Sequence, residues 1–286
     1  MPDGAEPAPE ELRALARELA RRTGHLLTEH RRAVADDVTV ARTKSSGTDV
    51  VTAADEAAER LLRDLLAEHR PDDGVLGEEE GVTAGTSGLT WVLDPLDGTV
   101  NYLYGLPAYA VSVAVARGDD PASWTVLAGA VHDAAHGGTF SAALGGGADL
   151  DGQPLRVSGC TRLEQCLLST GFSYRSEVRA EQGALLAHLL PRVRDVRRGG
   201  SAALDLCAVA AGRLDAHMER GLNPWDHAAA GLVVTEAGGL VHGPDGGPAS
   251  DALVVAGSPG VVPALERLLA EAAAATGARA AGSVGA

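Results

Sequence analysis

The chain has 286 residues, 45% of them apolar, so it can bury a large core as one domain or as two closely packed lobes. Its formal net charge of −15 argues against nucleic acid or an anionic membrane as a partner. No apolar run is long enough for a membrane span and no secretion signal is evident, so we expect a cytoplasmic protein. The three cysteines form no Cys-x-x-Cys pair, which favours reduced, buried thiols.

The N-terminal part of the chain is predicted to be helical. Leucines at roughly helical spacing indicate an amphipathic helix from Glu10 to about Ala35. The polar segment 44–48 then interrupts the pattern, as a mobile lid over the site or as an ordinary exposed loop. A second helix is expected to begin at Thr52 or Asp55 and to stop at Pro71.

Strands dominate the next part of the chain, and an alternating pattern follows them. We expect strands at 75–77 and 109–116, and a hairpin formed by 124–133 and 138–144. From about residue 165 short strands alternate with helices. The expected strands are 166–170, 193–197, 213–218 and 252–256, and the expected helices are 176–190, 201–211, 226–237 and 261–275. An α/β half therefore follows an α+β half.

No repeat or low-complexity linker separates the two halves, so they should pack as one unit. We expect a single domain over residues 10–275, with lobes at about 10–155 and 156–275. Residues 1–9 and 276–286 are rich in small residues and are predicted to be disordered tails.

The most informative segment is 91–101, with the sequence WVLDPLDGTVN. Residues 94–97 are predicted to form a sharp turn after a buried strand, and Gly98 and Thr99 can begin a helix. Carboxylates three residues apart can converge on one hard cation, and free amides at a helix start can bind an anionic oxygen. Together they suggest metal-assisted phosphate ester chemistry. Taken alone, the pattern is more typical of an acidic turn in which Asp caps a helix.

Further acidic residues stand at other element boundaries, where ligands of open α/β folds gather. Glu78 follows a strand, so its carboxylate could face the same cleft as those of the 94–97 turn. Asp226 begins an Ala-rich helix and by itself is more typical of an N-cap, as is Asp55. Glu79 and Glu80 are more typical of solvated neighbours of Glu78.

Five motifs, in one order from about residue 10 to 270, resemble the inositol monophosphatase family. They are Trp91–Tyr104 and Trp225–Gly239 for its two signatures, Gly77–Glu79 for its strand-end glutamate, Asp49–Asp55 for its N-terminal segment and Arg198–Ala203 for its substrate loop. Each motif alone is only moderately specific for the family, but five motifs in the family's order are strong evidence for the resemblance. Tyr104 departs from the pattern, because family members often have His there, and this puts fine specificity in doubt.

The resemblance implies a mixed α+β and α/β fold: the layered α-β-α-β-α sandwich of sugar phosphatases, with a metal cleft between two lobes. It also implies two to three Mg²⁺ ions per site. The ligands would be Glu78, Asp94 and the carbonyl of Leu96 for the first ion, Asp94, Asp97 and Asp226 for the second, and Glu78 with waters for a looser third. Oxygen donors suit Mg²⁺. No His/Cys set has zinc-ligand spacing, and His132, His136, His227 and His242 are interpreted as surface or turn residues.

The predicted mechanism is direct attack of a metal-activated water on a phosphate monoester. Glu78 and Thr99 would take up or orient the water's proton, and Asp55 would accept a hydrogen bond from the Thr99 hydroxyl. The amides of Gly98 and Thr99 would hold phosphate oxygens. Without the resemblance, Thr99 is better interpreted as a helix-start hydroxyl and Asp55 as an N-cap.

Substrate specificity must come from groups that reach the alcohol part of the ester. The resemblance assigns its hydroxyls to Asp97, Gly200, Ser201, Ala202, Glu219 and Asp226. Such acidic groups suit a polyol, so we expect hydrolysis of myo-inositol 1-phosphate, with histidinol phosphate second and fructose 1,6-bisphosphate a further alternative. For Glu219 a surface position is the alternative. Residues 172–175 follow a strand and could close the site from their own lobe or from a partner subunit.

The resemblance further implies inhibition by Li⁺ and a homodimer. The expected partner is a small phosphorylated polyol, with neither nucleic acid nor membrane. A non-catalytic binding or regulatory protein that uses the same cleft stays an alternative. The presence of all the expected acidic ligands speaks against it.

Overall fold

The structure is a computed structural model that describes residues 7–34, 40–44 and 50–276. The predictions for most of the N-terminal tail, for residues 45–48 of the polar loop, for Asp49 and for the C-terminal tail beyond residue 276 lie outside the described residues. Of the polar loop, only Lys44 is described.

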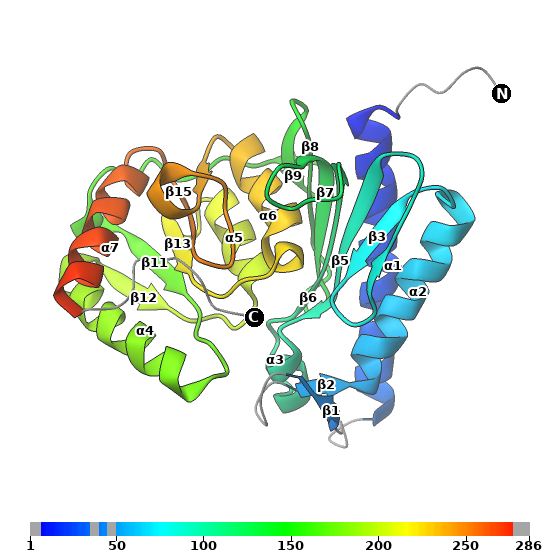
Figure 1. The fold of residues 1–286 in the computed structure, drawn as a ribbon, viewed down its shortest axis with the longest axis horizontal. Coiled ribbons are helices and arrows are strands. Elements are labelled where there is room, and N and C mark those ends of the chain that lie inside the picture. Colours follow the sequence, from blue (N-terminus) through cyan, green and yellow to red (C-terminus); the bar gives the residue numbers. More distant parts are fainter. Residues whose placement is uncertain (1–6, 35–39, 45–49, 277–286) are drawn as a thin grey trace.

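A large sheet covered by two helices forms one side of the molecule (Figure 1). The helices are α1 (Pro9–Val34) and α2 (Ala53–His69), and the sheet has the strand order β10-β9-β8-β7-β6-β5-β3-β4. Its strands are β3 (Gly74–Gly77), β4 (Gly81–Thr83), β5 (Leu89–Asp97), β6 (Ala110–Arg117), β7 (Thr125–Asp133), β8 (Thr139–Ala143), β9 (Gly147–Leu150) and β10 (Gln153–Pro154). Neighbours are antiparallel except β3 and β5, which are parallel.

A second, smaller sheet completes the layers. Between the two sheets lie α5 (Ala202–Ala210) and α6 (Pro224–Glu236), and α4 (Ser176–Leu189) and α7 (Val262–Thr276) cover the outer face. The second sheet has the order β12-β11-β13-β15-β14, with β11 (Leu167–Thr170), β12 (Asp195–Arg197), β13 (Ala216–Glu219), β14 (Leu240–His242) and β15 (Val254–Gly257). The expected α-β-α-β-α layering is therefore confirmed.

Short elements connect these layers. They are the hairpin of β1 (Val40–Thr43) and β2 (Val50–Thr52), the helix α3 (Thr99–Tyr104), and the 3₁₀ turns η1 (Leu163–Gln165), η2 (Leu190–Arg192) and η3 (Pro244–Gly246). Helix α3 follows β5 directly, so the strand end and the helix start share one corner of the molecule.

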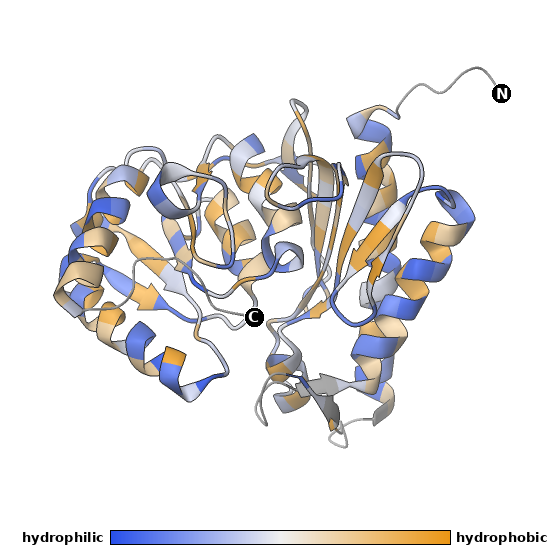
Figure 2. Cartoon of the chain, viewed as in Figure 1, coloured by the Kyte–Doolittle hydropathy of each residue, from blue (hydrophilic) through white to orange (hydrophobic). Residues whose placement is uncertain are grey.

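Alternation along the central strands distributes their side chains between two cores. On β5, Trp91 and Leu93 pack with α1 and α2, whereas Val92 packs with α5 and α6. This follows from the two-residue period of a strand. The apolar residues accordingly lie inside the layers and the hydrophilic ones outside (Figure 2). Helix α6 packs so close to the sheet that a Cβ added at Gly129 would lie 2.8 Å from the backbone of Ala229.

Some expectations about single residues change in the structure. His132 was interpreted as a surface or turn residue, but it is buried in β7 and bonds Thr139 Oγ1 at 2.9 Å. His136 does lie in an exposed turn. All three cysteines are free, and Cys166 and Cys207 are buried as expected, whereas Cys160 is only half-buried.

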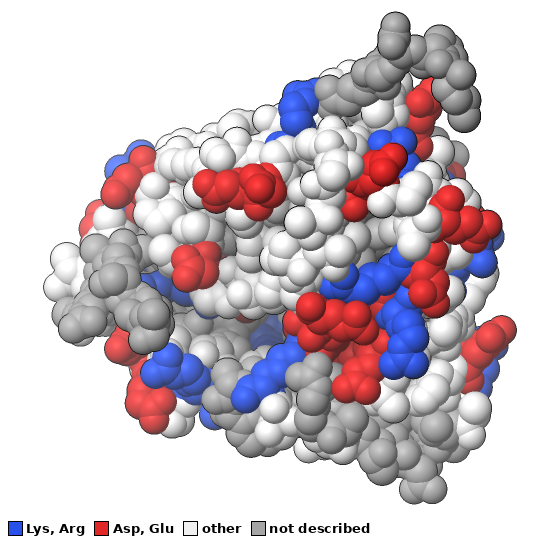
Figure 3. Space-filling view, turned by 45° about the vertical axis from the view of Figure 1, so that its right-hand side comes forward, with Lys and Arg blue, Asp and Glu red and all other residues white. Residues whose placement is uncertain are grey.

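The charge on the surface is mixed in sign. One face shows clusters of acidic side chains directly beside basic ones (Figure 3). Among the described residues, no helix combines the length and the apolar character that crossing a membrane would require.

Candidate active site

A cavity of about 420 Å³ opens between the two halves. It is lined by the end of β5 and the start of α3 on one side, and by the ends of β11 and β13 and the starts of α5 and α6 on the other. The predicted site residues that line it are Glu78, Asp94, Leu96, Asp97, Gly98, Thr99, Gly200, Ser201, Ala202, Glu219 and Asp226. Only Asp55 is not in the lining; it lies behind Thr99.

Asp94 and Asp97 come from the last part of β5. The predicted sharp turn at 94–97 is wrong, because β5 continues to Asp97 and pairs with β6 on both sides of a register irregularity between the two aspartates. Asp94 Oδ1 accepts a hydrogen bond from the Leu96 amide at 3.0 Å. Asp97 Oδ2 accepts from Ser201 Oγ at 2.5 Å and from the Ala203 amide at 2.8 Å. The irregularity thus lets two carboxyl groups on one strand reach the same cavity.

Glu78 follows β3, and its amide donates to the Leu93 carbonyl of β5 at 3.2 Å. Its Oε1 accepts from Lys44 Nζ at 2.7 Å. Lys44 Nζ also lies 2.6 Å from Glu79 Oε1. The expected solvated position of Glu79 is wrong, because its side chain is only 1% exposed, whereas that of Glu80 is 52% exposed. An ammonium group therefore lies between two carboxylates at this edge of the cavity.

A buried glutamate on α2 fixes the chain beside Glu78. Glu59 is fully buried, and its carboxylate accepts from the amides of Glu79 at 2.7 Å and Glu80 at 3.0 Å. It also bonds the Arg63 guanidinium at 2.9 Å. Gly77 allows this approach, because a Cβ there would clash with the Glu59 carboxylate. These contacts set the direction in which Glu78 leaves its strand.

Asp55 and Thr99 are joined by a hydrogen bond of 3.0 Å from Thr99 Oγ1 to Asp55 Oδ1. Asp55 is not the N-cap that its position suggested, because Thr52 is the N-cap of α2 and Asp55 completes its capping box. The Asp55 carboxyl accepts from the Thr52 amide at 2.8 Å. Burial raises the pKa of Asp55 to about 6, against the lowering effect of these hydrogen bonds.

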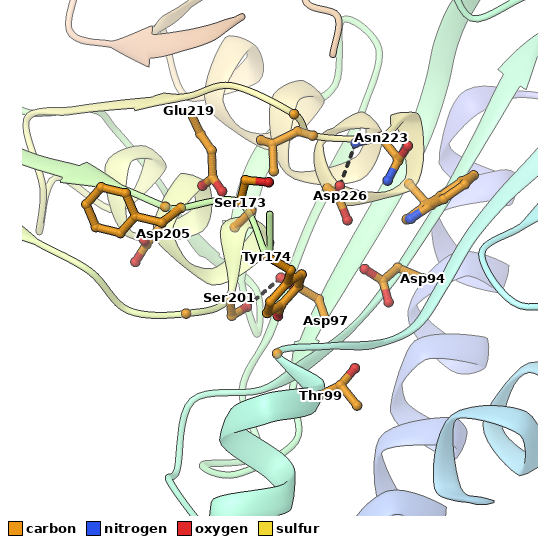
Figure 4. A pocket seen from close by; sticks show the side chains of 18 of the residues that line it. Asp94, Asp97, Thr99, Ser173, Tyr174, Ser201, Asp205, Glu219, Asn223 and Asp226 are labelled. Carbon is orange, nitrogen blue, oxygen red and sulfur yellow. Dashed lines mark hydrogen bonds between the residues drawn. The ribbon is translucent and has the colours of Figure 1, made fainter. Parts of the chain in front are cut away.

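Asp226 occupies the equivalent place at the start of α6. It is not the N-cap either, because Asn223 is, and the Asn223 amide donates to Asp226 Oδ2 at 2.6 Å. The side chains of Asp94 and Asp226 point toward the same space from β5 and from α6 (Figure 4). Burial raises the pKa of Asp226 well above its usual value, and the charges of Glu78 and Asp97 raise it further.

The acidic groups of the cavity interact electrostatically. Burial raises the pKa of Asp94 well above its usual value, and the charges of Glu78, Asp97 and Asp226 add to this effect. In the part of the chain that the structure describes, no three or more His, Cys, Asp or Glu side chains are gathered closely enough to hold a metal ion as they stand. The donor set is nevertheless entirely oxygen and mutually repulsive, which fits a hard divalent cation.

Gly98 and Thr99, at the start of α3, line the cavity. Gly98 has φ of 95°, and a Cβ there would lie 2.8 Å from the Ala108 carbonyl, so the position requires glycine. Asn101 Nδ2 donates to the Ala108 carbonyl at 2.7 Å and to the Gly199 carbonyl at 2.9 Å. Asn101 belongs to the first signature motif but received no role from the sequence. Its hydrogen bond to Gly199 connects α3 to the loop before α5.

The remaining lining residues surround the space opposite Asp94. The Glu219 side chain is 14% exposed, and its partial burial together with the charges of Asp97 and Asp205 raises its pKa to about 8. Asp205 lies inside α5 and was not predicted; burial and the charge of Asp97 raise its pKa to about 7. The segment 172–175 lines the cavity from its own lobe. Tyr104, the departure noted above, is 75% exposed and is absent from the lining.

Comparisons with known sequences and solved structures show to which family this chain belongs. The sequence model of the inositol monophosphatase family matches residues 8–281. An inositol-1-monophosphatase of Mycobacterium bovis is 52% identical over 231 residues, which are 77% of this chain and 78% of the relative. The Nus factor SuhB of Escherichia coli is 39% identical over 251 residues, 86% of this chain and 91% of the relative. The solved structure of Mycobacterium tuberculosis SuhB superposes with a TM-score of 0.79 at 44% identity, over 93% of this chain and 98% of that one. The chain therefore belongs to the inositol monophosphatase family.

Proposed function

We propose that this protein is a Mg²⁺-dependent phosphomonoesterase that hydrolyses myo-inositol 1-phosphate to inositol and phosphate. The observation that carries the proposal is that carboxyl groups from both halves face one cavity, beside the Thr99–Asp55 hydrogen bond and the amides of the α3 start. A relative that is 52% identical is named inositol-1-monophosphatase, which supports the same substrate.

The acidic residues would hold two to three Mg²⁺ ions. Glu78, Asp94 and the Leu96 carbonyl would bind the first ion, Asp94, Asp97 and Asp226 the second, and Glu78 with waters the third. When bound, these ions would lower the pKa of the attacking water and neutralise charge on the phosphate and the leaving alkoxide. They would also offset the repulsion that raises the carboxyl pKa values of the cavity.

The chain's own groups orient the nucleophile and the phosphate. Thr99 Oγ1 lies 3.0 Å from Asp55 Oδ1 and 3.0 Å from the Leu96 carbonyl. When its proton is donated to Asp55, the hydroxyl oxygen is left to accept a hydrogen bond from a water in the cavity. Glu78 is the second acceptor for that water. The amides of Gly98 and Thr99 are the donors for phosphate oxygens.

The far side of the cavity suits a hydroxylated alcohol. Glu219 and Asp226 offer carboxyl oxygens there, and residues 200–202 offer backbone groups of the loop before α5. We propose that Asp97, Gly200, Ser201, Ala202, Glu219 and Asp226 contact the ring hydroxyls. Histidinol phosphate and fructose 1,6-bisphosphate are the alternative substrates, because they carry hydroxyl or amino groups that the same acids would bind.

A second candidate function is a binding or regulatory role. The specific observation in its favour is that some relatives are named Nus factor SuhB, among them the one from Escherichia coli. Such a role could act through the same cleft or through another surface. We place it second because Glu78, Asp94, Asp97 and Asp226 all face the cavity.

Phosphate release from a panel of esters distinguishes these functions. The panel contains inositol 1-phosphate, histidinol phosphate, fructose 1,6-bisphosphate and 3′-phosphoadenosine 5′-phosphate, each with Mg²⁺, with EDTA, and with Mg²⁺ plus Li⁺. We expect the highest kcat/KM for inositol 1-phosphate, with loss of activity in EDTA and inhibition by Li⁺. No release from any ester would favour the binding role.

The assembly and location of the protein are part of the proposal. We expect a homodimer in the cytoplasm that binds neither nucleic acid nor membrane, in keeping with the net charge of −15. Sedimentation or light scattering measures the mass in solution. A monomer at micromolar concentration would contradict the dimer without affecting the proposed reaction.

A further inference from the structure

A buried histidine next to the cavity has one ring nitrogen without a hydrogen-bond partner. His217 lies in β13 and is fully buried. Its Nδ1 is 2.9 Å from Ser169 Oγ, whereas its Nε2 is buried and makes no hydrogen bond. Unpaired polar atoms are rare inside proteins because their desolvation is not compensated, so this nitrogen calls for an explanation.

The register of the second sheet places His217 between Ser169 and Glu219. Ser169 and His217 are partners on the parallel strands β11 and β13. His217 and Glu219 are two residues apart on β13, so their side chains leave the same face of the sheet. The residue between them, Met218, packs into the core under α4 and α7. A line of three polar side chains thus runs from the sheet interior to the cavity.

Glu219 is the member of this line that reaches the cavity, and it enters the pocket from the end of β13 (Figure 4). Its Oε2 lies 3.6 Å from His217 Nε2. That separation is longer than a hydrogen bond, and hydrogen bonds of substrate sites are often long without the substrate and shorten when it binds. On the other side the carboxyl packs against Gly171, where an added Cβ would clash with both of its oxygens. Gly171 and His217 therefore enclose the Glu219 carboxyl.

The protonation states of the two side chains are complementary. Burial, with the charges of Asp97 and Asp205, raises the pKa of Glu219 to about 8, so it is a neutral acid with a donor hydroxyl at pH 7. Burial lowers the pKa of His217 to about 3, so its ring is neutral. If Nδ1–H donates to Ser169, Nε2 carries the lone pair that the acid needs.

We infer that His217 is a positioning residue for substrate recognition, which anchors one oxygen of Glu219 through Nε2 and turns the other toward a hydroxyl of the substrate alcohol. The inference rests on the proposed function, because it assigns Glu219 to the leaving-group side of the same cavity. The chemical class that gains from it is a phosphate ester with a free hydroxyl near the ester oxygen. An ester without such hydroxyls gains nothing from the anchored acid.

Kinetics of His217→Phe with two substrates tests the inference. Phenylalanine fills the space but removes both nitrogens. We expect the KM for inositol 1-phosphate to rise by about tenfold and its kcat to change less than about threefold, since the contact concerns binding. The KM for 4-nitrophenyl phosphate, which has no alcohol hydroxyls, should not change. His217→Gln should recover part of the loss, because its amide can again bond Glu219.

The matched control is Val255→Ala. Val255 pairs with Met218 in the same sheet, and its side chain is buried in the core on the opposite face. The control should lower the thermal midpoint while leaving both KM values unchanged. An equal KM increase for both substrates in His217→Phe, or the same substrate-selective increase in Val255→Ala, would show a merely structural role and overturn the inference.

Nitrogen NMR of His217 provides a readout that does not depend on turnover. We expect the neutral ring with the proton on Nδ1, and an Nε2 shift that changes in Glu219→Ala but much less in Glu219→Gln. If the wild-type protein hydrolyses no inositol phosphate, the proposed function fails, and the NMR result alone then decides the anchoring contact. An Nε2 shift that is the same in wild type and Glu219→Ala would overturn it.

Discussion

The two sides of the cavity hold their acidic groups in different ways. On the side of β3, β5 and α2, short hydrogen bonds fix the surroundings of each carboxyl group: Glu59 bonds two amides beside Glu78, and Asp55 bonds Thr99 and Thr52. On the side of β13 and α5, Glu219 lies 3.6 Å from His217. The carboxyl groups that we propose for the phosphate and the ions thus have short hydrogen bonds around them, whereas Glu219, which we propose for the alcohol, has only this longer contact.

Asp226 is the exception on the second side. It is fixed by the same device as Asp55, a capping box at a helix start, and its carboxyl bonds the Asn223 amide at 2.6 Å. Both aspartates therefore have a short backbone hydrogen bond that limits their motion. The comparison indicates that Asp55 and Asp226, which we propose for the chemistry, are each fixed by a backbone hydrogen bond, whereas Glu219, which we propose for specificity, has only the longer contact with His217.

The largest effect is expected from Asp94→Asn, which removes the central carboxylate on the side of β3, β5 and α2. Turnover should fall by more than about a thousandfold, because a ligand of two proposed ions is lost. The thermal midpoint without metal should hold or rise, because a buried carboxyl repelled by Glu78, Asp97 and Asp226 is replaced by a neutral isostere. Steady-state kinetics and thermal unfolding in EDTA measure the two effects.

The control is Asp64→Asn, at an exposed position of α2. It should leave both quantities unchanged. Turnover by Asp94→Asn near that of the wild type would show that this carboxyl group takes no part in the chemistry.

A smaller effect is expected from Glu59→Gln, which tests whether the hydrogen bonds of the buried Glu59 carboxylate are needed to position Glu78. The amide end of glutamine would face a backbone N–H, so one of the bonds to Glu79 and Glu80 is lost. We expect kcat to fall by about 10- to 100-fold with a weaker response to Mg²⁺, the usual size for residues that orient ligands. Glu68→Gln, exposed on the same helix, is the matched control. Equal kcat in the two variants would contradict the positioning role of Glu59.

The stability of the metal-free protein should depend on pH in a way that separates the two sides. The pKa is about 6 for Asp55, about 7 for Asp205 and about 8 for Glu219, all raised. A carboxyl group with a raised pKa binds its proton more tightly when folded, so stability is lost as pH rises through these values. Between about pH 5.5 and pH 8.5 we expect the thermal midpoint in EDTA to fall by about 5 °C.

Two further measurements sharpen this pH test. Glu219→Gln should reduce the slope of the curve up to about pH 8, and it should remove most of the slope above about pH 7, where Asp55 and Asp205 contribute little. Saturating Mg²⁺ should flatten only the part of the curve that comes from the proposed ligands Glu78, Asp94, Asp97 and Asp226, because bound cations replace their protons. A thermal midpoint that rises with pH across this window in EDTA would contradict the raised pKa values.

The smallest effect is expected from Ser201→Ala, at the contact between the two sides. Ser201 is the N-cap of α5, accepts from the Leu204 amide at 3.2 Å, and donates to Asp97. We expect a loss of about 1 kcal/mol of unfolding free energy and a midpoint about 2–4 °C lower. The change in kcat should stay below that of Glu59→Gln. Ser123→Ala, in an exposed loop, is the control and should leave the thermal midpoint unchanged. The same thermal midpoint in the two variants would contradict the capping role of Ser201.

Periodicity in the sequence was sufficient to predict most of the helices and strands, whereas their arrangement in layers was implied by the family resemblance. The apolar residues of β5 and β6 and the leucines of α1 repeat with strand and helix periods, and each element was found within a few residues of its expected place. Strands β4 and β14 have three residues each, too few for alternation to show, and they were not predicted.

Most of the residues that line the cavity were predicted from the sequence, but the local structure of some of them was not, and others were missed. Pro95 and the two aspartates indicated a turn, but pairing with β6 keeps this segment in the sheet, because tertiary pairing overrides local preference. Asp205 was missed because it lies one turn inside an apolar helix, and only the packing of α5 decides that it faces the cavity. The role inferred for His217 depends on an unpaired nitrogen that no sequence pattern reveals.

The central claim is that carboxyl groups of both sides bind the same divalent ions. Anomalous diffraction from crystals of the protein soaked in Mn²⁺ tests it most directly. We expect peaks in the cavity between Glu78, Asp94, Asp97 and Asp226, and loss of those peaks in Asp94→Asn. A fully active protein whose crystals show no ion in this cavity, or ions only at other places, would contradict the account.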